Sequence, residues 1–230
     1  MSIRDNISTI RQRIDAACLK AGRDPQSVHL LAVSKKKPLA DIEAAAAAGQ
    51  TMVGENYVQE FVAKHDACTV DIDWHFIGAL QSNKVKYLRD RVAMIHSVDR
   101  LSLAQEIDRQ WARCAQPAAI LIQVNIGDEQ TKAGVSADEL EPLVRQIALL
   151  PHVRIRGLMA IPPHCDDPED SRHWFRAMRR LADAIAALNL PQVSMEELSM
   201  GMSDDFEVAI EEGATLIRIG TAIFGARDYA

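Results

Sequence analysis

Three adjacent lysines follow an apolar run near the N-terminus of the chain. The segment reads HLLAVSKKKP, in which the β-prone residues 29–33 precede Lys35, Lys36 and Lys37. A lysine at the end of a buried strand is partly desolvated, which lowers its pKa from about 10.4 and makes the neutral amine available to attack an aldehyde. Most lysines are solvated surface groups, so the position in the fold must separate the two interpretations.

The three lysines differ in the direction they are expected to face. Side chains alternate along a strand, so Lys35 and Lys37 share one face while Lys36 points the other way. Pro38 fits the first turn of a helix and favours an extended conformation for Lys37 in the connection. We therefore expect Lys35 to be the last residue of the strand and the imine-forming amine, with Lys37 as the alternative.

Two glycine-containing turns occur near the C-terminus: SMGMSDD (199–205) and RIGT (218–221). The first is expected to open a helix with Ser203 as its N-cap and with the two aspartates pointing outward. The second places Gly220 and Thr221 late in a strand. Backbone N–H groups at a helix start, a glycine that permits close approach and a hydroxyl together form an anion site. Each turn alone could be a simple cap or core segment, but together they predict a phosphate site.

Eight short apolar or β-branched runs alternate with helical patterns along the chain. The runs cover 29–35, 51–56, 74–78, 94–99, 118–126, 154–161, 195–201 and 216–225. Helical patterns cover 38–49, 100–115, 136–150 and 168–189. Near-continuous apolar strands separated by helices are typical of parallel strands that are buried on both faces. The pattern favours an α/β fold, a single (β/α)8 TIM barrel.

The organisation predicts one domain over residues 1–230, with an extra N-terminal helix at about residues 3–22 that could cover the bottom of the barrel. An open doubly wound sheet is the alternative, weakened because no GxGxxG follows the first strand. In a TIM barrel the functional groups lie at the C-terminal strand ends, and the loops after strands 7 and 8 often bind phosphate. Lys35 and the two turns are therefore predicted to meet at one mouth.

Composition excludes several classes of function. The 230 residues carry a net charge of −6, which argues against a nucleic-acid-binding face. No apolar run is long enough for a membrane span, and the N-terminus does not resemble a signal peptide. The four cysteines are scattered without metal-ligand spacing, so reduced thiols, a cytoplasmic location and no metal are expected. No coiled-coil repeat or long apolar stripe demands a dimer, and a monomer is expected.

A Schiff-base lysine beside a phosphate site suggests two classes of protein. One is a Schiff-base aldolase that acts on a sugar phosphate, and the other is a pyridoxal 5′-phosphate (PLP) protein. Arg218 lies two residues before Gly220 and is expected to project inward below the phosphate turn. A buried arginine needs a hydrogen-bond acceptor, which a pyridine nitrogen could supply.

The motifs resemble a known family along nearly the whole chain. They read AVSKKKP, GENYVQE, WHFIGALQSNK, RGLMAIPP, LSMGMSDDFEVAI and IRIGTAIFGARDY. This set is similar to the YggS/PROSC family of PLP homeostasis proteins, whose fold resembles the barrel domain of bacterial alanine racemase. The resemblance implies that Lys35 carries the PLP aldimine and that Arg218 faces the pyridine nitrogen. It further implies that Ser203, Gly220 and Thr221 hold the phosphate, with help from the backbone near Met202. Asn56 is implied to line the cofactor pocket.

Two other residues match family motifs. For His75 the more ordinary interpretation is a strand histidine that a neighbour satisfies, and for Lys132 it is a solvated loop lysine. Lys36 departs from the usual family pattern at a variable position, which leaves the assignment of Lys35 unchanged.

The type of residue facing the ring nitrogen bears on catalysis. PLP enzymes that form carbanions commonly keep this nitrogen protonated, whereas an arginine acts only as a donor. With Arg218 there, a quinonoid is poorly stabilised. Alanine-type racemases also need a base from another domain, and the chain ends at Ala230, a few residues past the eighth strand. We therefore expect a non-catalytic PLP-binding protein for intracellular PLP homeostasis and delivery, with apo PLP-dependent enzymes as the implied partners. The alternatives are a weak PLP-dependent racemase and an aldolase without PLP.

Overall fold

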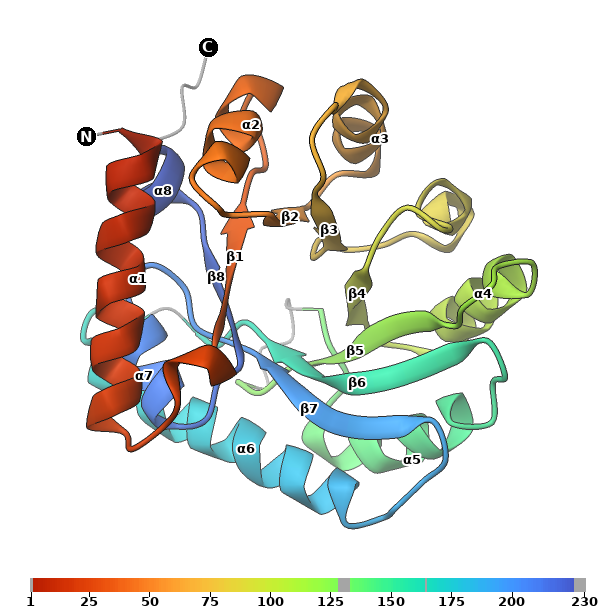
Figure 1. The fold of residues 1–230 in the computed structure, drawn as a ribbon. Helices are drawn as coiled ribbons and strands as arrows, with labels where there is room; N and C mark the ends of the chain where they lie inside the picture. The colour runs from red at the N-terminus through yellow and green to blue at the C-terminus, as the bar shows by residue number, and fades with distance from the viewer. Residues whose placement is uncertain (1, 128–132, 164, 226–230) are drawn as a thin grey trace.

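Eight parallel strands close into a barrel in chain order, as the sequence predicts (Figure 1). The computed structural model describes residues 2–127, 133–163 and 165–225. The strands are β1 (His29–Val33), β2 (Met52–Glu55), β3 (Asp73–Phe76), β4 (Met94–Val98), β5 (Ala118–Val124), β6 (Val153–Ala160), β7 (Val193–Ser199) and β8 (Leu216–Ile219). Strand β8 pairs with β1, which completes the barrel and excludes the open sheet.

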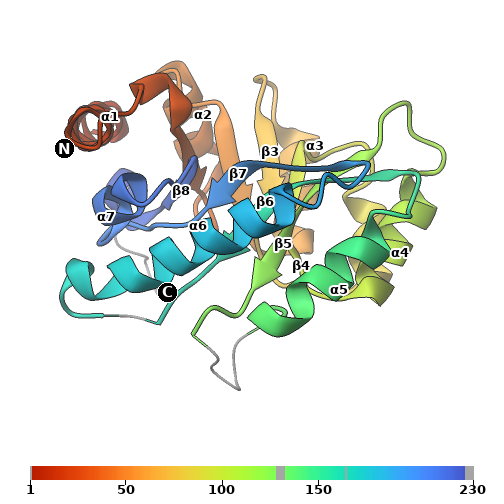
Figure 2. The ribbon, with the colours of Figure 1, turned by 90° about the horizontal axis from the view of Figure 1, so that it is seen from below.

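Helices follow the strands and cover the outside of the barrel (Figure 2). They are α1 (Ile3–Lys20), α2 (Leu39–Ala47), α3 (Val58–Ala67), α4 (Leu101–Trp111), α5 (Ala137–Ile147), α6 (Arg172–Ala186), α7 (Phe206–Glu211) and α8 (Thr221–Phe224). Short 3-10 turns are η1 (Pro25–Ser27), η2 (Ser82–Tyr87) and η3 (Pro168–Ser171). None of the helices in the described part of the chain is both long and apolar enough to cross a membrane.

The N-terminal helix is present, but the expectation that it covers the bottom of the barrel is wrong. Helix α1 lies along the side of the barrel and packs against α7, α8 and α2 (Figure 1). Its buried residues Ile7, Ile10 and Ile14 recur at helical spacing and form one apolar stripe. This stripe packs against neighbouring helices, so α1 belongs to the layer of helices outside the barrel.

All eight strands end earlier than their predicted runs, and two of these ends bear on the site. Strand β1 ends at Val33: the N–H of Ser34 still donates to Gly54 O, but the chain then turns, and the N–H of Lys37 donates to Ser34 O at 3.0 Å. Lys35 therefore lies in the turn after the strand and is not its last residue. Strand β8 ends at Ile219, because Gly220 already occupies the N-cap position of α8.

The barrel interior is layered. Its lower part holds a small apolar cluster that is separate from the main core: Met94, Leu121, Met159 and Leu216. Because side chains alternate along a strand, His96 and Arg218, two residues after Met94 and Leu216, also point inward. The polar layer that they form lies between the apolar cluster and the C-terminal mouth of the barrel.

Candidate functional site

One cavity at the C-terminal mouth of the barrel brings together every predicted site residue. Its volume is about 610 Å³. The predicted residues that line it are Lys35, Asn56, Met202, Ser203, Arg218, Gly220 and Thr221. They come from the ends of β1, β2, β7 and β8, which are far apart in the sequence. Other residues complete this lining, and among them the charged Arg13 reaches it from α1, which the sequence did not predict.

The lysine cluster is separated as the alternation predicts. Lys35 and Lys37 are half-buried and line the cavity, whereas Lys36 is exposed and is not part of the lining. Lys37 Nζ donates to Phe224 O at 3.0 Å, which ties this lysine to α8. Lys36 has a φ of 59°, so the chain turns sharply at this residue.

A buried ion cluster holds the turn that carries Lys35. Lys64 Nζ donates to Ser34 O at 2.8 Å and to the carboxylate of Glu55 at 2.6 Å. Glu60 accepts from Lys64 Nζ at 2.7 Å and from the N–H of Lys36 at 2.6 Å. The backbone on both sides of Lys35 is therefore anchored to α3.

One of the two carboxylates in this cluster, that of Glu55, is fully buried. Burial raises the pKa of Glu55, and the ammonium group of Lys64 opposes that rise. Ser34 also donates to Glu55 Oε1, at 2.5 Å. A charge in this position is stable only while its partner is present, so Lys64 keeps the turn in place by neutralising Glu55.

Arg218 projects inward from β8, as predicted, and forms the floor of the cavity. Its side chain donates through one terminal nitrogen to Ser199 Oγ and through the other to Ala160 O, each at 2.8 Å. Burial lowers the pKa of Arg218 to about 10, and the carboxylate of Asp205 opposes this. The guanidinium therefore stays charged at neutral pH and acts only as a donor.

The turn after β7 differs from the prediction. Helix α7 begins at Phe206 with Asp205 at the N-cap position, so Ser203 is not the cap. Asp205 does not point outward: its carboxylate accepts the N–H of Met202 at 2.7 Å, and burial raises its pKa. The backbone N–H of Met202 is thus already bonded, so the polar groups that this turn contributes to the cavity are the hydroxyl of Ser203 and the carboxylate of Asp204.

Close backbone approaches shape two walls of the cavity. A Cβ atom added to Gly220 would lie 3.2 Å from Val33 O, so a larger residue there would require the start of α8 or the end of β1 to shift by a few tenths of an ångström. A Cβ atom on Gly78 would lie 2.0 Å from Asn56 O. Among the described atoms, Asn56 Oδ1 is buried without a hydrogen-bond partner, so it can accept a bond from a ligand.

The charged groups around the cavity favour an anion. The lining contains four cationic side chains and one carboxylate, that of Asp204. Arg13 is partly neutralised because it pairs with Glu207 at 2.8 Å, but Lys35, Lys37 and Arg218 also line the cavity. An aldehyde that carries a phosphate matches an amine together with this positive potential.

The two remaining motif residues lie elsewhere. His75 is satisfied by a neighbour, as the ordinary interpretation predicts: its Nδ1 lies 2.8 Å from His96 Nε2 inside the barrel, and it does not line the cavity. Lys84 of the LQSNK segment lines a separate hollow between α3 and η2. Lys132 lies outside the described residues.

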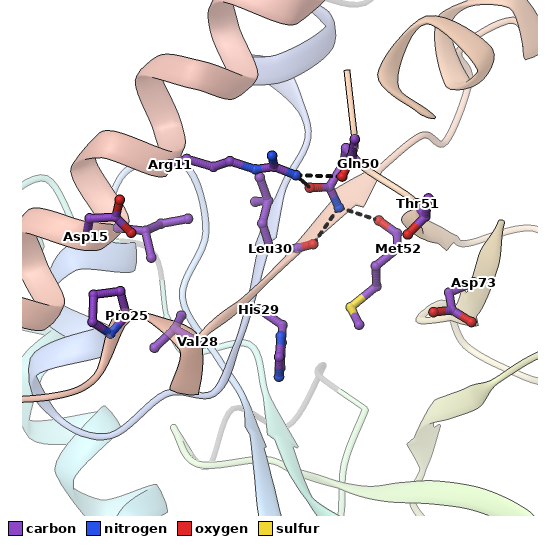
Figure 3. A pocket seen from close by; sticks show the side chains of 12 residues that line it. Arg11, Asp15, Pro25, Val28, His29, Leu30, Gln50, Thr51, Met52 and Asp73 are labelled. Carbon is purple, nitrogen blue, oxygen red and sulfur yellow. Dashed lines mark hydrogen bonds between the residues drawn. The ribbon is translucent and has the colours of Figure 1, made fainter. Parts of the chain in front are cut away.

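A second cavity, of about 350 Å³, lies at the opposite end of the barrel (Figure 3). Arg11 donates there to Gly49 O at 2.7 Å, and Gln50 donates to Leu30 O at 2.6 Å and to Met52 O at 2.8 Å. These groups hold helix and strand ends together, as Figure 3 shows. None of the described residues that line this second cavity is a lysine.

The chain is similar to known proteins over nearly its whole length. Residues 2–228 match the family model described as the alanine racemase N-terminal domain. The pyridoxal phosphate homeostasis protein of Aquifex aeolicus (strain VF5) is 46% identical over 230 residues, which cover 100% of each chain. That of Escherichia coli (strain K12) is 44% identical over 233 residues and covers 99% of this chain and 98% of its own.

A solved structure of a relative has PLP bound. PipY of Synechococcus elongatus PCC7942, with PLP bound, superimposes with a TM-score of 0.84 at 36% sequence identity and covers 97% of this chain and 100% of its own. The resemblance found in the sequence motifs is thereby confirmed. The chain belongs to the family of the alanine racemase N-terminal domain, together with the pyridoxal phosphate homeostasis proteins.

Proposed function

We propose that this protein binds PLP as a Schiff base on Lys35 and serves intracellular PLP homeostasis by storing and delivering the cofactor. One observation carries the proposal: a lysine amine, two hydroxyl groups and a buried arginine surround one cavity. The names of its relatives and the PLP-bound structure of PipY support it.

Each lining residue has a defined task in this proposal. The hydroxyls of Ser203 and Thr221 donate to the phosphate, and Gly220 lets the backbone at the start of α8 come close to it. Asn56 Oδ1, which is buried and unpartnered among the described atoms, accepts a donor from the ring. Met202 contributes its side chain to the rim, because its N–H is bonded to Asp205.

Arg218 favours binding over catalysis. Bound PLP supplies an aldehyde that links to the lysine and a ring that can act as an electron sink when its nitrogen is protonated. Arg218 presents a donor to that nitrogen and keeps it unprotonated, so the electron sink is weak. We therefore propose a protein without substantial catalytic activity. Weak amino-acid racemisation is the second candidate, because the family model is that of an alanine racemase domain.

The remaining parts of the proposal concern organisation and partners. We propose that residues 1–230 form one PLP-binding domain, because the strands of the closed barrel extend from His29 to Ile219. We also propose a monomer that transfers PLP to apo PLP-dependent enzymes. The four cysteines are unpaired, which fits the reducing environment of the cytoplasm.

Visible absorbance tests the proposal. The purified protein is incubated with PLP, dialysed and scanned, with Lys35→Ala as the test variant and Lys36→Ala as the matched control. The Schiff-base band is expected in the parent and in Lys36→Ala but not in Lys35→Ala. Absence of the band from the parent would refute PLP binding through an amine.

Two further assays separate the candidate functions. The loaded protein is incubated with L-alanine, and the D-isomer is quantified; substantial turnover would support the racemase. The loaded protein is then mixed with an apo PLP-dependent enzyme, and the recovered activity is measured. A carrier restores activity faster than it releases PLP to buffer.

A further inference from the structure

A chain of buried side chains leads away from the cavity into the barrel. Arg218 donates to Ser199 Oγ at 2.8 Å, His96 Nδ1 lies 3.0 Å from the same oxygen, and His96 Nε2 lies 2.8 Å from His75 Nδ1. Ser199 and His96 are fully buried, and His75 is 4% exposed. The chain links β8, β7, β4 and β3 across the interior.

The arginine determines the direction of every hydrogen bond in this chain. Arg218 can only donate, so Ser199 Oγ accepts from it. The hydroxyl proton of Ser199 then has one acceptor among the described residues, His96 Nδ1. His96 consequently carries its proton on Nε2 and donates to His75 Nδ1. In the reverse order the buried hydroxyl proton of Ser199 would have no partner, which is costly.

Both histidines must be neutral for this order to exist. A proton on His96 would place a second positive charge one serine away from Arg218, and burial and that charge both lower the pKa of His96 well below its usual value. Burial likewise lowers the pKa of His75 to about 4, with His29 contributing repulsion. Arg218 is thus the one cation among these four hydrogen-bonded residues.

We infer that His75, His96 and Ser199 are positioning residues that lock the guanidinium of Arg218 in one orientation, with its free donors directed at the ring of the bound cofactor. The consequence for the cofactor rests on the proposed function, whereas the order of the chain does not. If the histidines only filled the barrel, replacing Ser199 would change neither their tautomers nor the affinity for PLP.

Nitrogen-15 NMR of the histidine rings in the protein without PLP tests the order directly. Both His75 and His96 are expected as neutral rings protonated on Nε2 at pH 7. Ser199→Ala should remove this fixed tautomer at His96, because Nδ1 loses its donor. A proton on Nδ1 of His96 in the parent would overturn the inference, whatever the protein binds.

The affinity for PLP tests the positioning role. Ser199→Ala should weaken PLP binding about tenfold, the factor that a loss of about 1.4 kcal/mol gives. Ser97→Ala is the matched control: Ser97 lies beside His96 on β4, is 2% exposed and has no hydroxyl partner among the described atoms. It should bind PLP like the parent.

Two replacements of His96 give a second comparison. Asparagine keeps an acceptor near the position of Nδ1 and should preserve most of the affinity, whereas leucine should weaken binding as Ser199→Ala does. Equal losses in both variants, or equal affinities of Ser199→Ala and Ser97→Ala, would overturn the positioning role. If the leucine variant does not fold, the serine pair decides. If the parent binds no PLP, the proposed function fails, while the NMR result still tests the chain.

Discussion

The buried histidines should make the protein unstable in mild acid. His75 is neutral in the folded state because burial lowers its pKa from 6.5 to about 4. In the unfolded chain the same ring takes up a proton below about pH 6.5. The unfolded state therefore binds more protons between pH 6.5 and 4, and the free energy of unfolding falls as the pH falls through this range.

The size of the effect follows from the two pKa values. At 1.36 kcal/mol for each unit of pKa, the difference between 6.5 and about 4 corresponds to about 3.4 kcal/mol once both states are protonated. At pH 5 the loss from His75 is about 2 kcal/mol. This is a substantial fraction of the total stability of an ordinary domain, about 5–15 kcal/mol.

Urea unfolding of the parent and of His75→Asn at pH 8 and at pH 5 measures the effect. Asparagine keeps an acceptor for His96 but does not titrate, and the other ionisable groups are common to both proteins. The loss of stability between the two pH values should be about 2 kcal/mol smaller in the variant. Equal losses in parent and His75→Asn would refute the reasoning.

Three further predictions concern the frame of the site. Lys64→Met should lower the free energy of unfolding by about 3–5 kcal/mol, because it leaves the carboxylate of Glu55 buried without a counter-charge. Urea titration measures this loss, and Lys64→Met combined with Glu55→Gln should recover most of it. Gly78→Ala should cost about 1–3 kcal/mol and weaken PLP binding, since its Cβ would collide with Asn56 O; unchanged thermal unfolding and affinity would contradict the geometry. Lys36→Gly should raise the free energy of unfolding by about 0.5–1 kcal/mol, because Lys36 has a φ of 59°; a decrease would show that its side chain stabilises the turn.

The barrel could be predicted because its strands are buried on both faces. Most strands then appear as near-continuous apolar runs, whereas β7 carries Glu196 and Glu197 and is buried only at its end. Lys35 lines the cavity and Lys36 does not, as expected, but both lie in the turn after Val33, so strand alternation is not the reason. Strand ends are harder to predict because the last backbone bonds depend on the neighbouring strand and loop, which spacing along the chain does not reveal.

The parts of the site that were missed depend on contacts between distant residues. Asp205 was expected to point outward. An acidic residue near the start of a helix is compatible both with that orientation and with the observed bond to the N–H of Met202, so the sequence does not distinguish them. His96 and Ser199 are 103 residues apart in the sequence. No sequence motif predicts that their side chains form a hydrogen bond. Arg13 reaches the cavity only because α1 lies on the side of the barrel.

Covalent trapping at Lys35 tests the central claim most directly. The protein loaded with PLP is reduced with borohydride, digested and mapped by mass spectrometry, which converts a Schiff base into a stable link at one lysine. A single modified site is expected at Lys35, with Lys36 and Lys37 unmodified. Modification at Lys37 in place of Lys35, or no modified peptide from a protein that retains PLP, would contradict it.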